Sequence, residues 1–228
     1  MLTFVFDASE TPAQRVARVA REAVCDGPMG CWLRRDRYAS FLDIWNMSDD
    51  YSHLIDSLHA GKVLAGVKTS CAVDASAVLG YAGRKLRKPW KADGTWGINS
   101  WLGLGFDDES WVEAVAPKTG VRREPEEGHV FYRGGKQAKN GHVGTFALRL
   151  ENGLWRTVEG GGNLRGDEGE GLTTAQVKAT NGTVMRMTPE DGKDVWALDS
   201  SGRHLTGWWD TNRIGLPTGE EVLGRLAT

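Results

Sequence analysis

The chain has 228 residues, with 28 basic and 30 acidic side chains and a formal net charge of −2. This length fits one domain with its own core, and the balanced charge gives no overall attraction to nucleic acid. The 10 Trp, 6 Phe and 4 Tyr residues exclude a disordered chain. No apolar run reaches 18 residues, so no membrane span is expected.

Three helical regions are predicted in the first 82 residues. The first is an amphipathic helix over residues 11–24, with Thr11 as its N-cap and a proline at its first position. A second helical region covers residues 38–58. A third helix begins after Ser70 and continues to about Ala82, where the glycine that follows is typical of a helix end.

The rest of the chain is predicted to be irregular at first and then mostly strand. Residues 89–127 are rich in Trp and Gly and read as an irregular insertion with a short helix near residues 110–116. Strands are then expected over residues 129–133, 144–150, 154–159, 184–187, 195–198 and 205–209. Helices followed by a run of strands indicate a single α+β domain.

Cys71 opens the third predicted helix. The three cysteines are an odd, low number, which argues against a disulfide framework. Unpaired N–H groups and the positive end of the helix dipole lie in the first helical turn and favour a thiolate, the nucleophilic form of cysteine. The alternative is a small buried thiol without a chemical role.

His142 and Glu159 are the candidate partners of this thiol. His142 lies in the segment Gly141-His142-Val143-Gly144, where a strand leaves a tight turn, and histidine is the usual base for a thiol. The dipeptide Asn152-Gly153 predicts a hairpin that brings Glu159 beside His142, where a carboxylate can orient the imidazole. The alternatives are a surface histidine and a solvated glutamate at a strand end.

These motifs resemble the papain-like cysteine peptidases of bacterial cell-wall turnover, the CHAP and NlpC-type amidases and endopeptidases. The segment Gly128-His129-Val130-Phe131 resembles the Gly-Asp-Val-Phe with which that family begins its sheet. His129 replaces the usual Asp and is either a substrate contact or a residue without a role. Ser70-Cys71-Ala72-Val73 departs from the Asp-Cys-Ser-Gly common in NlpC-type members. The resemblance covers about residues 60–160.

The resemblance implies a papain-like core over residues 61–160, with a helical extension over residues 1–60 and a loop and C-terminal strands over residues 161–228. It implies that Cys71 attacks an amide of peptidoglycan, that His142 transfers the proton, and that Glu159 fixes the imidazole. The sequence has no His-Glu-x-x-His and no paired Cys-x-x-Cys motif, so we expect no metal and no other cofactor. Two tryptophans of the insertion are either packed under a loop or line a substrate groove: Trp96 and Trp101.

Other functions stay open at this point. The same scaffold serves non-catalytic cell-wall binding, and the same three residues serve a deamidase or transglutaminase that acts on a protein. An immunity or inhibitor protein is the expected partner of a toxin of this type, whereas nucleic acid is not expected. The N-terminus lacks the basic and apolar regions of a signal peptide. We therefore expect synthesis in the cytoplasm and action on the cell wall after lysis or specialised export.

Overall fold

The protein is seen here in a computed structural model. It describes residues 7–25, 32–33, 71–84, 109–134, 141–160, 185–188 and 190–226. Three predictions lie outside the described residues: the helical region over residues 38–58, Trp96 and Trp101.

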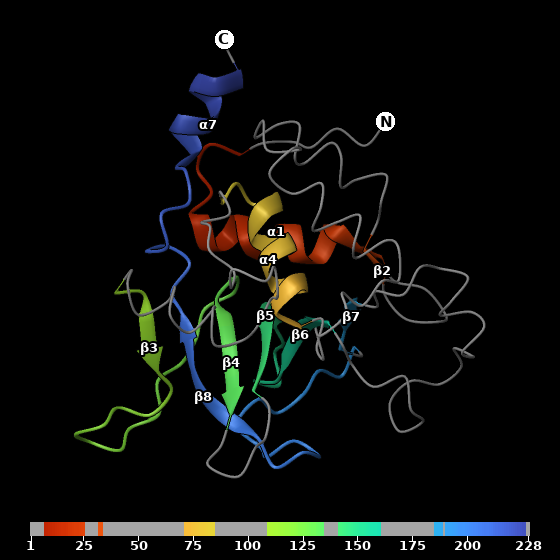
Figure 1. Ribbon diagram of the computed structural model, residues 1–228, viewed down its shortest axis with the longest axis vertical. Coiled ribbons are helices and arrows are strands. Elements are labelled where there is room, and N and C mark those ends of the chain that lie inside the picture. Colours follow the sequence, from red (N-terminus) through yellow and green to blue (C-terminus); the bar gives the residue numbers. More distant parts are fainter. Residues whose placement is uncertain are drawn as a thin grey trace, which may run out of the picture.

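Two helices, α1 (Pro12–Ala23) and α4 (Cys71–Tyr81), pack on an antiparallel sheet (Figure 1). Within the described residues this sheet has six strands in the order β3-β8-β4-β5-β6-β7. Its strands are β3 (Trp111–Glu113), β4 (Val130–Gly134), β5 (His142–Arg149), β6 (Trp155–Gly160), β7 (Met185–Met187) and β8 (His204–Trp209). β1 (Val24–Cys25) and β2 (Trp32–Leu33) form a separate pair, and the helix α7 (Gly219–Leu226) lies near the C-terminus. The predicted α+β class and antiparallel sheet are confirmed.

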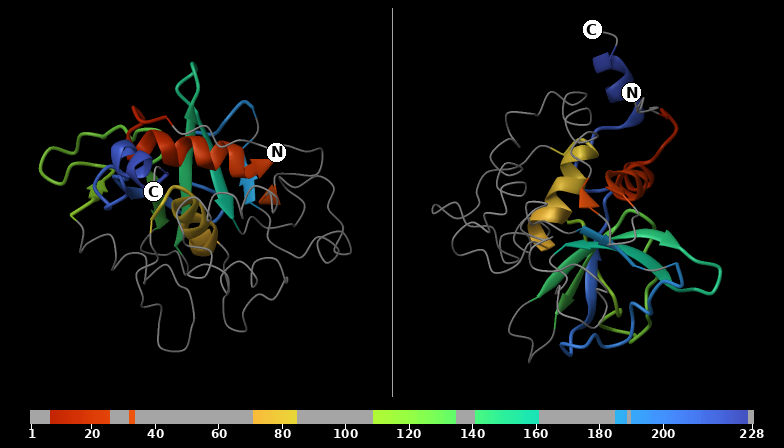
Figure 2. Two further views of the ribbon diagram at one scale, coloured as in Figure 1. Left: turned by 90° about the horizontal axis from the view of Figure 1, so that it is seen from above. Right: turned by 90° about the vertical axis from the view of Figure 1, so that its right-hand side faces the viewer.

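The helix α1 begins as its sequence predicts. Thr11 Oγ1 accepts a hydrogen bond from Gln14 N at 3.2 Å, and Gln14 Oε1 accepts one from Thr11 N at 2.8 Å. This reciprocal pair is a capping box, which satisfies two N–H groups at the helix start. One face of α1 is buried, and it carries five small or branched apolar side chains: Ala13, Val16, Ala17, Val19 and Ala20. In the side view of Figure 2, α1 and α4 lie together on one side of the curved strands.

The helix α4 ends at a Schellman motif around Gly83, which confirms the predicted end. Arg84 N donates to Leu79 O at 2.9 Å and Gly83 N donates to Gly80 O at 3.0 Å. The fully buried Arg15 of α1 donates from Nε to Ala82 O at 3.0 Å. The two helices are therefore tied together at the C-terminal end of α4, while Cys71 at its other end meets His142 of β5.

The hairpin β5–β6 has the predicted turn. Gly153 has a φ of +80°, a left-handed conformation that glycine adopts readily. Leu150 N donates to Leu154 O at 2.9 Å, and Asn152 Oδ1 accepts from Leu154 N at 2.9 Å. The turn sets the register of the pairs next to it, and a β-bulge between Phe146 and Leu148 shifts the register by one residue farther along the hairpin.

One predicted helix and one predicted strand are wrong. The segment predicted as a short helix near residues 110–116 contains β3, in which Trp111 pairs with Trp209 of β8. Pairing with a distant strand overrides the local helical pattern. The predicted strand over residues 195–198 is a turn, because Asp194 Oδ1 accepts from Trp196 N at 2.9 Å and turns the chain.

The helix α7 was not predicted, although its sequence carries a start signal. Thr218 Oγ1 accepts from Glu221 N at 3.3 Å, and Glu221 Oε2 accepts from Thr218 N at 2.6 Å. The pattern Thr218-x-x-Glu221 is a capping box of the same kind as the one at α1.

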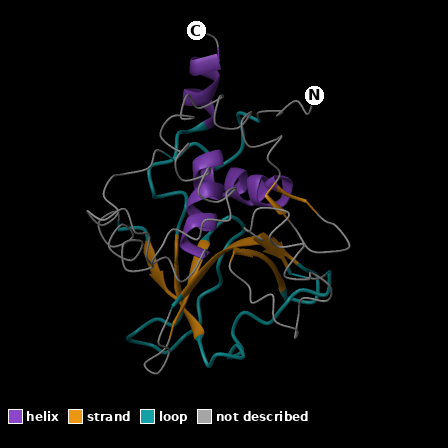
Figure 3. Ribbon diagram, turned by 45° about the vertical axis from the view of Figure 1, so that its right-hand side comes forward, coloured by secondary structure: helices purple, strands orange, loops and turns teal. Residues whose placement is uncertain are grey.

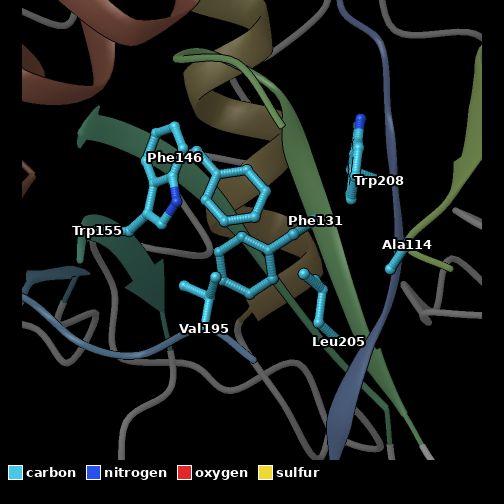
Figure 4. Packing of buried hydrophobic residues seen from close by; sticks show 7 residues of the cluster. All are labelled: Ala114, Phe131, Phe146, Trp155, Val195, Leu205 and Trp208. Carbon is cyan, nitrogen blue, oxygen red and sulfur yellow. The ribbon is translucent and has the colours of Figure 1, made fainter. Parts of the chain in front are cut away.

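The strands of the sheet are curved (Figure 3), and buried aromatic and aliphatic side chains cluster against them (Figure 4). The ring centroids of Phe131 and Phe146 are 4.9 Å apart, and those of Phe146 and Trp155 are also 4.9 Å apart. Val195 reaches this cluster from the turn after β7 and is 2% exposed. The turn is thus anchored on the sheet by its own apolar side chain. Among the described helices, none is long and apolar enough to cross a bilayer.

Candidate functional site

The side chains of Cys71, His142 and Glu159 form one connected group. His142 Nε2 lies 2.7 Å from Glu159 Oε2, and the His142 ring also hydrogen-bonds the Cys71 side chain. Because Glu159 occupies Nε2, the nitrogen left for the thiol is Nδ1. Cys71 is 1% exposed and is not part of a disulfide. The predicted proximity of the three residues is confirmed, whereas their chemical role stays a prediction.

The hairpin register explains why Glu159 meets His142. Thr145 pairs with Val158, so Glu159 lies beside Gly144 on the neighbouring strand. Gly144 and His142 are two residues apart on β5, and side chains two apart share a face of a strand. A β-bulge between Phe146 and Leu148 shifts this register by one residue from the pairing next to the turn, so the turn and the bulge together bring Glu159 to the face of His142.

Gly144 leaves the space that the Glu159 side chain occupies. A Cβ atom at this position would lie 2.5 Å from Cζ of Phe131 and 2.7 Å from Cγ of Glu159. Both distances are shorter than side chains tolerate, so both neighbours would have to move. A residue without a side chain is therefore required between the aromatic ring and the carboxylate.

Replacing Gly144 by alanine is expected to lower the free energy of unfolding by about 1–3 kcal/mol, because it overpacks this space. Gly224→Ala is the matched control, since Gly224 lies exposed in α7 and a Cβ there meets nothing within 4 Å. Urea denaturation of the two variants and the parent measures the difference. Equal stability of both variants would contradict the close packing at Gly144.

Glu159 is held as a carboxylate by a cation and a hydroxyl. Lys193 Nζ and Thr157 Oγ1 both donate to Oε1, the oxygen that His142 does not use. Burial by itself raises the pKa of the Glu159 carboxyl, but the charge of Lys193 and the hydrogen bond from His142 outweigh it and hold that pKa well below its usual range. Glu159 is therefore ionised at neutral pH.

His142 is expected to carry a proton at neutral pH. Burial by itself lowers the pKa of His142, whose side chain is 12% exposed, but its hydrogen bonds to Cys71 and Glu159 and their negative charges outweigh this and raise the pKa to about 9. An imidazolium beside a thiol favours the thiolate. The arrangement thus places a histidine whose protonated form is favoured in contact with the side chain of Cys71.

Glu159→Gln is expected to move the titration of His142 from about pH 9 to lower pH, because it removes a negative charge that favours the protonated ring. NMR titration of the His142 ring proton, assigned by its absence in His142→Gln, measures the midpoint. Glu190→Gln is the matched control, since Glu190 is exposed. An unchanged midpoint in Glu159→Gln would contradict the ion pair.

His129 lies apart from this group of three. It is 5% exposed, its Nδ1 accepts a hydrogen bond from Glu126 N at 3.2 Å, and its Nε2 lies 3.3 Å from Asp210 Oδ1. Burial holds the pKa of His129 below its usual value, despite the charge of Asp210. Its ring also stacks on Trp208 with centroids 6.5 Å apart. These contacts tie the turn before β4 to the end of β8, and they do not bring His129 to His142.

Two residues of the site were missed by the sequence analysis. Thr157 could have been found, because it lies two residues before Glu159 and shares its face of β6. Lys193 comes from the loop after β7 and carried no local signal. The described residues contain no cluster of His, Cys, Asp and Glu suited to a metal ion.

Comparison of the chain with protein-family models, with curated proteins and with solved structures found no match.

Proposed function

We propose that the protein is a cysteine hydrolase that cleaves an amide bond, with the chemistry of a papain-like peptidase. The observation that carries this proposal is the position of His142, which hydrogen-bonds the Cys71 side chain on one side and Glu159 on the other. Cysteine nucleophiles of this kind are recognised by a base in contact with the thiol and a third group that orients the base.

The reaction follows from the protonation states of the group. The Cys71 thiolate attacks the amide carbonyl and forms a carbon–sulfur bond, while His142 carries the proton that the thiol has given up. The imidazolium then donates this proton to the leaving amine as the carbon–nitrogen bond breaks. Water, deprotonated by the now neutral imidazole, attacks the thioester and releases a carboxylic acid, and the thiol is restored.

Glu159 acts in this scheme by holding the ring. Its Oε2 accepts from Nε2–H, which fixes the tautomer and leaves Nδ1 for proton transfer with Cys71. A carboxylate in this position also stabilises the imidazolium that the first step requires. Because Glu159 stays ionised well below neutral pH, this support is present throughout the physiological range.

We propose peptidoglycan peptides as the substrate class, on the resemblance of the motifs around Cys71, His142 and Glu159 to cell-wall amidases and endopeptidases. A role as an antibacterial toxin or a phage lysin, with action outside the cytoplasm and an immunity or inhibitor protein as partner, belongs to the same proposal. No metal or other cofactor takes part in the proposed mechanism.

Incubation of purified sacculi with the protein, followed by mass spectrometry of the soluble fragments, tests this function. Cleavage should release fragments with one new amine and one new carboxylic acid for each bond broken. Retention of the protein on sacculi without new fragments would instead identify a binding module. Loss of ammonia from a protein glutamine, with sacculi left intact, would instead identify a deamidase.

A further inference from the structure

Lys193 reaches Glu159 from a segment that is fixed to the sheet by its backbone. Lys193 N donates to Trp155 O at 2.9 Å, and Trp155 N donates to Lys193 O at 3.0 Å, so that the lysine continues the sheet at the start of β6. Val195 holds the same segment in the core. The lysine backbone is therefore placed by contacts that do not depend on its own charge.

The ammonium of Lys193 and the imidazole of His142 hold opposite oxygens of one carboxylate. Lys193 Nζ donates to Glu159 Oε1, whereas His142 Nε2 lies at Oε2. Lys193 Nζ also lies 5.7 Å from the ring centroid of Phe131. A carboxylate held at both oxygens has little freedom to turn away from the imidazole.

The other nearby cation is engaged elsewhere. Arg133 lies opposite His142 in the pairing of β4 with β5. Its Nη2 donates to Val195 O at 3.1 Å and to Ala197 O at 2.5 Å, so that it holds the turn after Lys193. Among the described residues, the charged or titratable groups that face Glu159 are thus Lys193 and His142, with Cys71 behind the imidazole.

We propose that Lys193 is a positioning residue for the group of Cys71, His142 and Glu159: it fixes the Glu159 carboxylate so that Oε2 stays on the imidazole. This inference rests on the proposed function for its catalytic consequence. Its structural part, the control of the Glu159 carboxylate, is measurable without turnover. Without the lysine charge, the buried carboxylate has His142 as its one described cation and takes up a proton at higher pH.

The experiment compares two neutral variants with one that keeps the charge. Lys193→Met retains an unbranched apolar side chain, Lys193→Gln retains a hydrogen-bond donor, and Lys193→Arg retains the cation. Lys118→Met is the matched control, because Lys118 is exposed in a turn. The measurement is a ¹³C NMR titration of the Glu159 carboxyl carbon, assigned by its absence in Glu159→Gln, with the acidic limb of the pH–rate profile on sacculi as second readout.

Lys193→Met and Lys193→Gln are expected to raise the midpoint of the Glu159 titration by about one to three pH units. The acidic limb of hydrolysis should move in the same direction, and Lys193→Arg and Lys118→Met should keep the parent values. A purely structural lysine would change thermal stability and leave the Glu159 midpoint in place, which would overturn the proposal. If Lys193→Met does not fold, the midpoint of the Glu159 titration in Lys193→Gln tests the proposal.

The two proposals fail in different ways. Absence of hydrolysis by the parent protein would remove the proposed function, and the Glu159 titration would still report the role of Lys193 in placing the carboxylate. An unmoved titration together with normal hydrolysis would overturn the role of Lys193 alone.

Discussion

Replacing Cys71 by alanine is expected to lower the rate of amide hydrolysis by at least about 10⁴-fold, because it removes the atom that forms the thioester. Neither His142 nor Glu159 can take over this covalent step from its position. The rate that remains would come from binding and from donors that stabilise the transition state. The release of new amines from sacculi measures the rate for both proteins.

The fold should survive this change. Cys71 lies at the start of α4 with 1% of its surface exposed, and removal of one sulfur atom from such a site costs about 1 kcal/mol. Equal far-UV spectra and similar melting temperatures would show that the loss of activity is chemical. Cys25→Ala is the matched control, because Cys25 lies in β1, outside the group of three. Hydrolysis that persists in a folded Cys71→Ala protein would contradict the proposed mechanism.

His142→Gln is expected to reduce hydrolysis by about 10³- to 10⁴-fold, because glutamine can neither carry the thiol proton nor donate it to the leaving amine. Glutamine has a similar size, and its amide can still donate to Glu159. Lys193 continues to neutralise that carboxylate, so the variant does not leave an unpaired buried charge.

The pH–rate profile distinguishes loss of proton transfer from loss of structure. The parent protein should lose activity as the pH rises through about 9, where His142 gives up the proton that the leaving amine requires. His142→Gln should lose this alkaline limb together with most of the rate. His204→Gln is the matched control, since His204 is exposed on β8. A variant at His142 that keeps the parent profile would exclude this residue as the acid.

Most of the candidate site could be predicted from the sequence because its signals are local. A cysteine in the first turn of a helix is visible from the cap and the helical period. The hairpin itself follows from one turn, Asn152-Gly153, whereas the residue of β6 that faces His142 also depends on the β-bulge between Phe146 and Leu148. The turn is a local signal, but the bulge that places Glu159 beside Gly144 was not predicted.

The predictions that failed depend on contacts between distant segments. Trp111 belongs to a strand because β8, almost one hundred residues later, offers an edge for pairing. The apolar run over residues 195–198 is a turn because Asp194 bonds the backbone two residues ahead, although its spacing resembles a strand. Lys193 could not be placed beside Glu159 without knowledge of how the loop after β7 returns to β6.

The acyl-enzyme itself tests the central claim, that Cys71 is the nucleophile, most directly. The protein in excess over a soluble peptidoglycan peptide is quenched with acid at successive times, and the peptide that contains Cys71 is analysed by mass spectrometry. The predicted result is an adduct with the mass of the acyl half of the substrate on Cys71, which rises and then decays as the carboxylic acid product forms. Product that forms while the Cys71 peptide stays unmodified at every time would contradict the claim.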